Sequence, residues 1–301
     1  MSILTIQPLA VDSSNNFTFG SVTSVNSFGF KNRLINGQMQ IAQRGTSGTS
    51  GSSAPTTSTV YPSVDRWYAY ATGATVTVAQ VAGSGSTKNL LQATGAASVT
   101  AIGIGQRIEQ LNCYDMAGQT ATLSVNISNS LLTTVTWTAS YATSADTWSS
   151  KTQIATGTFT VSSTLTNYST QISIPSAATT GIEILFTVGA QTSGTWVIGN
   201  AQLELGSQQT SFDYRSITNE LQLCQRYYQI NNGVWTVYSG TGFINIPLLV
   251  TMRTAVTPTV NLISGTGTLT ISGSSYNGTS SFRINSSSGT NDFSWTANAE
   301  L

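Results

Sequence analysis

Stretches in which threonine or serine alternates with an apolar residue dominate the chain. Such alternation places one row of side chains on each face of a β-strand, and Thr and Val suit a strand that is buried on one face only. Clusters of Gly, Ser and Asn separate the stretches at short, fairly regular intervals, which is typical of an antiparallel sandwich or jelly roll. The clearest stretches are "ATVTVAQVA" (74–82), "TATLSVNIS" (120–128), "TTVTWTASY" (133–141), "TGTFTVSS" (156–163), "STQISIP" (169–175) and "GIEILFTVG" (181–189).

One segment, "SITNELQLCQRYYQI" (216–230), departs from this alternation. Its apolar and aromatic positions recur at the spacing of one helix face, and Ser216 or Thr218 is placed to cap the first turn. The positions that define the spacing are Ile217, Leu221, Cys224 and Tyr228. We therefore predict a short helix here, after which the chain returns to strands.

The predicted fold class is all-β: an antiparallel β-sandwich (jelly roll), then a short helix, then a small C-terminal β domain. A domain as small as the last buries a limited share of its surface and often needs a partner chain. The predicted parts are an N-terminal attachment segment (1–30), the sandwich (31–215), the connecting helix (216–229) and the C-terminal domain (230–301).

The charge balance argues against several partners. The 301 residues include 11 basic and 11 acidic residues, so the net charge is zero and only 7% of the chain is charged. A neutral chain has no field to concentrate nucleic acid or an anionic membrane surface. No run has the length of a transmembrane helix, and the N-terminus lacks the basic and apolar regions of a signal peptide. We expect no nucleic-acid binding, no membrane insertion and no export by that route.

Residue types that support catalysis or metal binding are scarce. Histidine is absent, which removes the commonest general base and zinc ligand. Glycosidases need two carboxylates that face each other across the sugar, and no DxE, ExD, GxSxG or HExxH motif is present. We expect no catalytic residue, no metal and no cofactor. Cys113 and Cys224 have no metal-ligand spacing; two isolated buried thiols and a single disulfide both stay open.

Four blocks carry a resemblance to a known family: "NRLINGQMQIAQRG", "DRWYAY", "GQRIEQLN" and "AQLELGSQQTSFDYRSITNELQLCQRYY", in that order between residues 32 and 228. Together they resemble a module of bacteriophage tail-fibre and receptor-binding proteins. The resemblance implies a jelly roll similar to carbohydrate-binding modules, within a homotrimeric fibre. It further implies a virion (phage tail) location, synthesis in the host cytoplasm, and attachment to other tail or baseplate proteins through the N-terminal segment.

Carbohydrate-binding jelly rolls often hold a structural calcium between their first and last strands. By this resemblance the matching stretches are "NGQMQI" and "VIGNAQLEL". Gln40 and Asn200 stand where acids are expected, and neutral amides coordinate calcium weakly without a carboxylate. The sequence therefore argues against a tight calcium site.

The charged residues within the four blocks are interpreted as structural ion pairs. An arginine in a chain with so few ions needs a carboxylate partner if it is buried, because an unpaired buried ion costs several kcal/mol. Arg66 is placed to pair with Glu109 or Glu204, and Arg215 with Asp213 or Glu220, which would join the helix to the sheet. The full set is Asp65, Arg66, Arg107, Glu109, Glu204, Asp213, Arg215 and Glu220.

Aromatic residues in loop-like contexts are the candidates for glycan binding. An aromatic ring offers a flat apolar face to the C–H groups of a sugar, while neighbouring amides and hydroxyls supply hydrogen bonds. The alternative for each is packing in the core or at a subunit interface, the role assigned to Trp67 and Trp196. The candidates are Trp148, Trp235, Tyr238, Tyr276 and Trp295, of which the last four fall in the C-terminal domain.

Two functions from different classes follow. The first is a tail-fibre adhesin that attaches the phage to a host-surface glycan through its C-terminal tip. The second is a purely structural virion protein, such as a capsid decoration or a head-fibre protein without a ligand. In either case "FINIPLLV" (243–250) is too apolar for a free edge, and we expect sister subunits around a three-fold axis to cover it.

Overall fold

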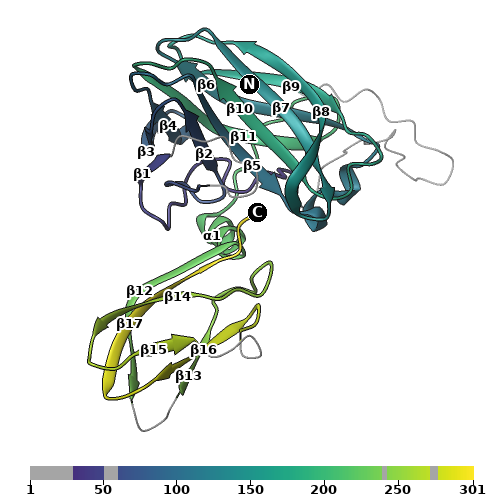
Figure 1. Cartoon of the computed structure of the whole chain (residues 1–301). Helices are drawn as coiled ribbons and strands as arrows, with labels where there is room; N and C mark the ends of the chain where they lie inside the picture. The colour runs from purple at the N-terminus through teal and green to yellow at the C-terminus, as the bar shows by residue number, and fades with distance from the viewer. Residues whose placement is uncertain (1–29, 51–59, 239–242, 272–276) are drawn as a thin grey trace, which may run out of the picture.

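Two β-sandwiches with a helix between them make up the described part of the chain. In the computed structural model, residues 30–50, 60–238, 243–271 and 277–301 are described. Figure 1 shows the larger sandwich, helix α1 (Ile217–Gln225) and the smaller sandwich in succession. The predicted all-β class, with a short helix before a small C-terminal β region, is confirmed. The predicted attachment segment, 1–30, lies outside the described residues except for Phe30.

The larger sandwich consists of two antiparallel sheets. The six-stranded sheet has the order β1-β3-β4-β11-β6-β9, and the five-stranded sheet has the order β2-β5-β10-β7-β8. Two 3₁₀ turns, Gln110–Asn112 and Tyr114–Met116, follow β5. The strands are β1 (Ser47–Ser50), β2 (Tyr68–Thr72), β3 (Val76–Ser84), β4 (Thr87–Thr94), β5 (Ala101–Ile108), β6 (Thr120–Asn129), β7 (Thr134–Ser144), β8 (Thr147–Thr160), β9 (Thr166–Ser173), β10 (Ile182–Val188) and β11 (Thr195–Leu205).

The alternation of the sequence sets which face of each strand is buried. Successive side chains of a strand point to opposite faces, so every second residue enters the space between the sheets. On β6 these residues are Ala121, Leu123, Val125 and Ile127, all fully buried. Ile182, Ile184, Phe186 and Val188 do the same from β10 in the opposite sheet. Trp67 and Trp196 are fully buried in the same core.

Helix α1 begins where the sequence predicts. Ser216 is its N-cap, and the Ser216 hydroxyl accepts a hydrogen bond from the backbone N–H of Asn219. The predicted C-terminal end at residue 229 is wrong, because the helix ends at Gln225 and Tyr228 already belongs to β12. Pairing of Tyr228 with Asn298 of β17 pulls the chain into a sheet and overrides the helical spacing. No helix within the described ranges is long and apolar enough to span a membrane.

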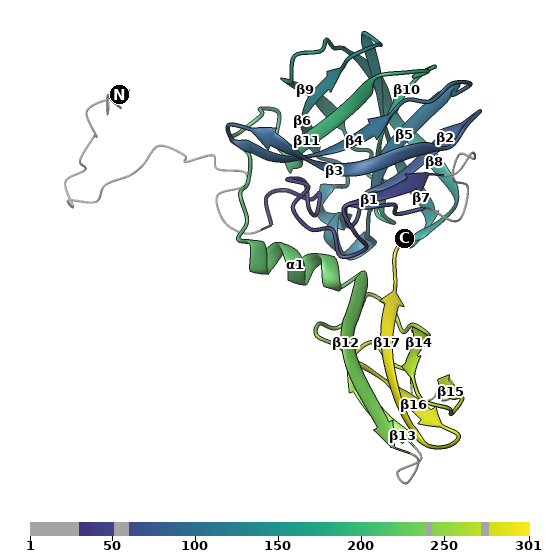
Figure 2. The same cartoon turned by 90° about the vertical axis from the view of Figure 1, so that its left-hand side faces the viewer.

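The smaller sandwich packs two three-stranded sheets, β12-β17-β14 and β13-β16-β15, around a core that includes Phe282, Phe293 and Trp295. Its strands are β12 (Tyr228–Tyr238), β13 (Phe243–Pro247), β14 (Thr259–Ser264), β15 (Leu269–Ile271), β16 (Ser281–Ser286) and β17 (Thr290–Asn298). Figure 2 shows β12 leaving α1 and β17 returning toward it, which places the C-terminus beside the larger sandwich.

A bulge in β11 connects the first block of the resemblance to the larger sandwich. The β11–β6 register shifts between Gly199 and Gln202, which removes the bulged residues from the regular ladder. Segment 32–37 supplies the missing partners: the Ala201 N–H donates to the Gly37 carbonyl oxygen at 2.9 Å, and the Asn32 amide donates to the Ala201 carbonyl oxygen at 2.9 Å. The bulge is therefore a docking point for residues 32–37.

The close approach at Gly37 leads to a prediction. A Cβ atom on residue 37 would overlap the backbone carbonyl oxygen of Ala201, so Gly37→Ala must push segment 32–37 away from the bulge. We expect the free energy of unfolding, measured by urea denaturation, to fall by about 1–3 kcal/mol. Gly189→Ala is the matched control, because a Cβ there would meet nothing within 4 Å. Equal stability of the two variants would contradict the proposed docking.

Candidate functional site

Amide side chains take the place of backbone partners in the segment before β1. This segment is buried but outside any sheet, so its N–H and C=O groups must find other partners. The Gln106 amide accepts from the Ile35 N–H at 2.7 Å and donates to the Ile35 carbonyl oxygen at 2.7 Å, as a neighbouring strand would. The Asn36 amide does the same for Ile41. The run of amides in "NRLINGQMQIAQRG" is therefore structural.

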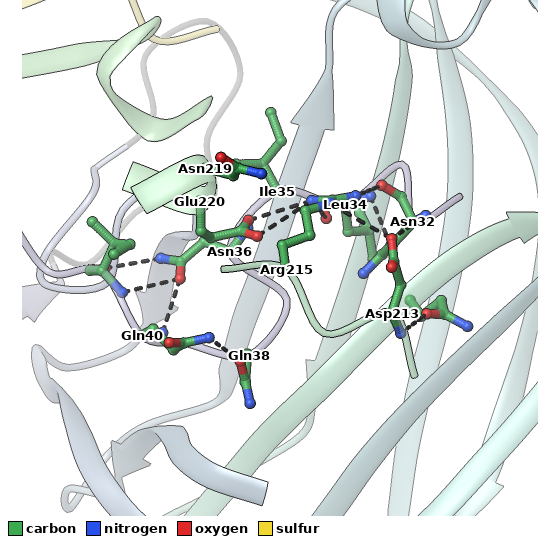
Figure 3. Close-up of polar contacts among 12 residues, drawn as sticks. Asn32, Leu34, Ile35, Asn36, Gln38, Gln40, Asp213, Arg215, Asn219 and Glu220 are labelled. Carbon is green, nitrogen blue, oxygen red and sulfur yellow. Dashed lines mark hydrogen bonds and ion pairs between the residues drawn. The ribbon is translucent and has the colours of Figure 1, made fainter. Parts of the chain in front are cut away.

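Helix α1 is tied to the same segment by a buried carboxylate. Glu220 accepts a hydrogen bond from the Asn36 N–H and lies 3.4 Å from the Arg215 guanidinium (Figure 3). Arg215 also lies 3.6 Å from Asp213 and donates to the Asn32 carbonyl oxygen. Burial raises the pKa of Glu220, while Arg215 opposes the shift. The three charged residues thus lie between the helix and residues 32–36.

A second buried cluster joins the two sandwiches. The Glu300 carboxylate, just after β17, pairs with Arg66 and lies 3.2 Å from Arg44. The two guanidinium groups lie over aromatic rings at the start of the smaller sandwich, Arg66 at 3.5 Å from the Tyr227 ring centroid and Arg44 at 3.6 Å from that of Tyr228. Cations, rings and carboxylate form one buried stack between the sandwiches. We call this stack, together with α1 and its ion pairs, the junction.

The predicted partners of Arg66 are wrong, because its carboxylate is Glu300 rather than Glu109 or Glu204. Glu109 forms an ion pair with Arg226 at 2.7 Å and accepts a hydrogen bond from the Tyr227 hydroxyl at 2.8 Å. Glu204 lies on β11 of the six-stranded sheet, whereas Arg66 lies two residues before β2 of the other sheet. The Glu204 carboxylate accepts hydrogen bonds from the N–H of Thr210 at 2.9 Å and from its hydroxyl at 2.6 Å.

The two remaining members of the predicted set are buried as well. Arg107 lies 3.0 Å from Glu183, whose other oxygen pairs with Lys151. Asp65 lies 3.3 Å from Arg44 and accepts from the Gln43 amide at 2.6 Å. Burial raises the pKa of Asp65, and the Arg44 charge opposes the shift.

The cysteines are separate buried thiols, so no disulfide joins Cys113 to Cys224. Burial raises the pKa of Cys113 to about 12 and that of Cys224 well above its usual range, which keeps both protonated. The positions weighed for calcium are engaged with other side chains: Gln40 with Gln38, and Asn200 with Thr87 at 3.1 Å. Among the described residues, no three His, Cys, Asp or Glu side chains are grouped to hold a metal ion.

Two of the predicted glycan-binding aromatics are buried, which corrects their assignment. Trp148 lies on β8 with 4% of its surface exposed, 5.1 Å from the Arg107 guanidinium. Trp295 is 2% exposed and packs edge-on against Phe282 with ring centroids 5.1 Å apart. Both rings fill cores, because strands pass through sequence that looks loop-like from its Ser and Asp content.

The other three predicted aromatics have different surroundings. Trp235 is half-buried against the core of the smaller sandwich, and Tyr238 is 60% exposed at the end of β12. Tyr276 lies outside the described residues. Tyr238 is thus the one candidate of the five with a largely exposed ring among the residues that the structure describes.

A polar surface that the sequence analysis missed lies on β6 and β9. Their inward residues fill the core, so the intervening residues face away from it. The outward pairs along this ladder are Gln171 with Thr122, Ser169 with Ser124, and Asn167 with Asn126. We call these six residues the polar ladder. Its three β9 residues are exposed, whereas Thr122 and Ser124 of β6 are buried and Asn126 is half-buried.

A pocket with a volume of ≈ 530 Å³ opens beside the polar ladder. This volume lies within the range of about 300–1,000 Å³ that is common for small-ligand sites. All of its lining side chains are neutral hydroxyls or amides: Thr122, Ser169, Thr170, Gln171, Ser207, Gln208 and Gln209. Thr122 is buried and donates to the Gly206 carbonyl oxygen at 2.7 Å, whereas Ser169 and Gln171 are exposed. The arrangement offers hydrogen bonds without a charge. The sequence signal that could have indicated this surface is the presence of amides at outward positions of "TATLSVNIS" and "TNYSTQIS".

A second pocket, of ≈ 490 Å³, lies along one face of α1. Its lining combines apolar residues, among them Phe30 and Leu223, with Arg215 and Arg226. Both guanidinium groups are already paired with carboxylates, as described above. This pocket therefore borders the junction, and its polar groups serve the fold.

Comparison with known proteins gives no family model and no curated protein that matches the chain. Among solved structures, one titled "CBM4 structure and function" is 14% identical, with a TM-score of 0.36, over 47% of this chain and 88% of that chain. The xylan-binding domain from CBM 22 is 17% identical, with a TM-score of 0.34, over 48% and 90%. The enzymatically active domain of bacteriophage CBA120 tailspike protein 4 is 20% identical, with a TM-score of 0.36, over 47% and 19%. At these values the likeness concerns the β-sandwich fold alone.

Removing the carboxylate between the sandwiches should weaken the junction. Glu300→Gln leaves Arg66, which is 1% exposed, without an opposite charge, and we expect a loss of about 3 kcal/mol in the free energy of unfolding. Hydrogen exchange of the Ala299 N–H, which donates to the Tyr227 carbonyl oxygen at 2.7 Å, should also accelerate. The control is Asp115→Asn. Asp115 pairs with Arg33 and is more exposed than Glu300, so the loss in the free energy of unfolding should stay below about 1 kcal/mol. Equal losses in both variants would contradict a special role for Glu300.

Proposed function

We propose that the protein is a subunit of a phage tail fibre that attaches the virion to a glycan on the host surface. The observation that carries this proposal is the pocket beside the polar ladder, whose lining is wholly neutral and rich in hydrogen-bonding groups. Each sugar hydroxyl both donates and accepts a hydrogen bond, as do amides and hydroxyls of the lining. A neutral, hydroxyl-rich ligand therefore matches the pocket better than an ion or an apolar molecule.

The tail-fibre part of the proposal rests on the four sequence blocks, which supply Arg44, Arg66, Tyr227 and Tyr228 at the junction described above. In this proposal the segment 1–30 attaches the subunit to other tail or baseplate proteins, and the smaller sandwich is distal. Tyr238 and Trp235 stay candidates for a further contact with the host at that end. The alternative function is that of a structural virion protein without a ligand, and the adsorption experiment below distinguishes it from an adhesin.

The subunit is proposed to assemble as a homotrimer through the smaller sandwich. The expectation that the whole run 243–250 is covered by sister subunits needs correction, because Ile246 is fully buried in its own subunit. Other apolar residues of this sandwich are exposed: Val234, Tyr238, Phe243, Leu249, Leu262 and Ile263. The outer strands β12 and β14 also carry no charged residue, although charges normally prevent pairing of sheet edges between chains.

Adsorption of the purified, fluorescently labelled protein to candidate host cells tests the function. We expect saturable binding that is lost when the surface glycans are oxidised with periodate, because oxidation cleaves the vicinal diols that the hydroxyl-binding lining would recognise. Binding that survives oxidation would point to a protein receptor. No binding to any cell that supports the phage would favour the structural alternative.

Light scattering coupled to size-exclusion chromatography tests the assembly. We expect a mass of three chains at micromolar concentration. Replacing Leu262 and Ile263 with Thr, which keeps the β-propensity of β14 but removes exposed apolar surface, should shift the protein toward monomer. Val60→Thr, an exposed apolar residue of the larger sandwich, is the control and should leave the mass unchanged. A monomeric parent protein would contradict the trimer.

A further inference from the structure

A row of hydrogen-bonded amides crosses the six-stranded sheet at one end of the polar ladder. The Gln209 side-chain amide donates to the Oδ1 atom of Asn167 at 2.7 Å, the Asn167 amide donates to Oδ1 of Asn126 at 2.8 Å, and the Asn126 amide donates to the Thr87 hydroxyl at 2.6 Å. The row thus starts on the segment after β11 and crosses β9 and β6 to β4. Gln209 and Asn167 are exposed, Asn126 is half-buried and Thr87 is buried.

The hydrogen bonds of the row fix the orientation of each amide. Each amide also keeps donor and acceptor sites that the row does not use. A primary amide has two N–H donors and a carbonyl oxygen with two lone pairs. Within the row, Asn167 and Asn126 each use one donor and one lone pair. Because all three amides donate in the same direction, a ligand meets donors and acceptors in a fixed order, and neighbouring bonds strengthen one another.

The polar ladder extends the row along the strands. Residues two apart on a strand are about 6.8 Å apart, so three successive pairs cover about 14 Å. Along that distance the exposed groups are the side chains of Asn167, Ser169 and Gln171 on β9, all hydroxyls or amides. Thr122 and Ser124 of β6 are buried, and the Gln171 amide donates to the Ser207 carbonyl oxygen at 2.7 Å. A single sugar is shorter than this surface, whereas a chain of sugars is long enough to contact both ends.

The nearest carboxylate does not alter this chemistry. Glu204 is fully buried, and its oxygens are occupied by Thr210 and by the Gln202 amide at 2.9 Å. No lining residue of the pocket is charged. A ligand carboxylate placed here would lose hydration without gaining an opposite charge, which is unfavourable.

We propose, on the basis of the function proposed above, that the exposed β9 side of the polar ladder and the amide row bind a neutral, unbranched stretch of the glycan lengthwise along β9. The site recognises the interior of a chain rather than its terminal sugar. Neutral chains are favoured over acidic chains of the same length, because the lining supplies many hydrogen bonds and no cation.

The first arm of the test uses adsorption of the full chain to cells. The double variant Asn167→Ala/Gln171→Ala removes two exposed amides on β9, and we expect its affinity for the cells to fall about tenfold or more. Gln153→Ala/Thr158→Ala on β8, which changes exposed polar residues of the other sheet, should stay within about twofold of the parent. Thermal unfolding of both variants confirms that each remains folded.

The second arm uses defined competitors. These are short and long neutral oligosaccharides from the surface polysaccharide of a cell that binds the protein, and the same oligosaccharides with their primary alcohols oxidised to carboxylates. We expect inhibition of adsorption to strengthen with chain length and to weaken after the oxidation.

The outcomes separate the two proposals. Periodate-sensitive adsorption that is the same in the double variant and the parent leaves the glycan-binding function standing but overturns the site. Inhibition that does not depend on chain length overturns interior recognition, and equal inhibition by oxidised chains overturns the preference for neutral ligands. A parent protein that adsorbs to no host cell overturns the function and this inference together.

Discussion

The Glu300 carboxylate, held between Arg44 and Arg66, is the interaction on which the arrangement of the two sandwiches depends. Glu300 follows β17, the central strand of the sheet β12-β17-β14, so anchoring it at the larger sandwich fixes the strand that both outer strands pair with. Both arginines lie over tyrosines that precede or begin β12, so the entry and exit of the smaller sandwich meet at one place. In a chain with so few ions, burying these charges is tolerable only because they are paired and stacked.

Local signals in the sequence predicted the elements well, because their cause is local. The alternation of Thr with apolar residues follows from the pleat of a strand, and Ser216 caps α1 because its hydroxyl reaches an N–H three residues later. The end of α1 and the partner of Arg66 were not predictable in this way. The end of α1 depends on the pairing of Tyr228 with Asn298 of β17, and the partner of Arg66 is Glu300, 234 positions further along the chain.

The candidate site was missed for a physical reason as well. Outward Ser, Thr, Asn and Gln residues are what any half-solvated strand carries, so Asn126, Asn167 and Gln171 do not stand out until register places them opposite and beside one another. The aromatic signal failed in the opposite direction. Trp148 has polar neighbours in sequence, yet the strand alternation turns its ring toward Arg107 and a buried cluster.

The segment between β11 and α1 connects the candidate site with the junction. Gln202 and Glu204 point outward from β11 and hold this segment, Gln202 through the Asp213 N–H at 2.8 Å and Glu204 through Thr210. On one side of these contacts Gln209 begins the amide row, and on the other Arg215 binds Glu220 of α1. The irregular composition of "AQLELGSQQTSFDYRSITNEL" follows from this, because nearly every polar residue has a different partner. A change in this segment therefore acts on the polar ladder and on the junction at once.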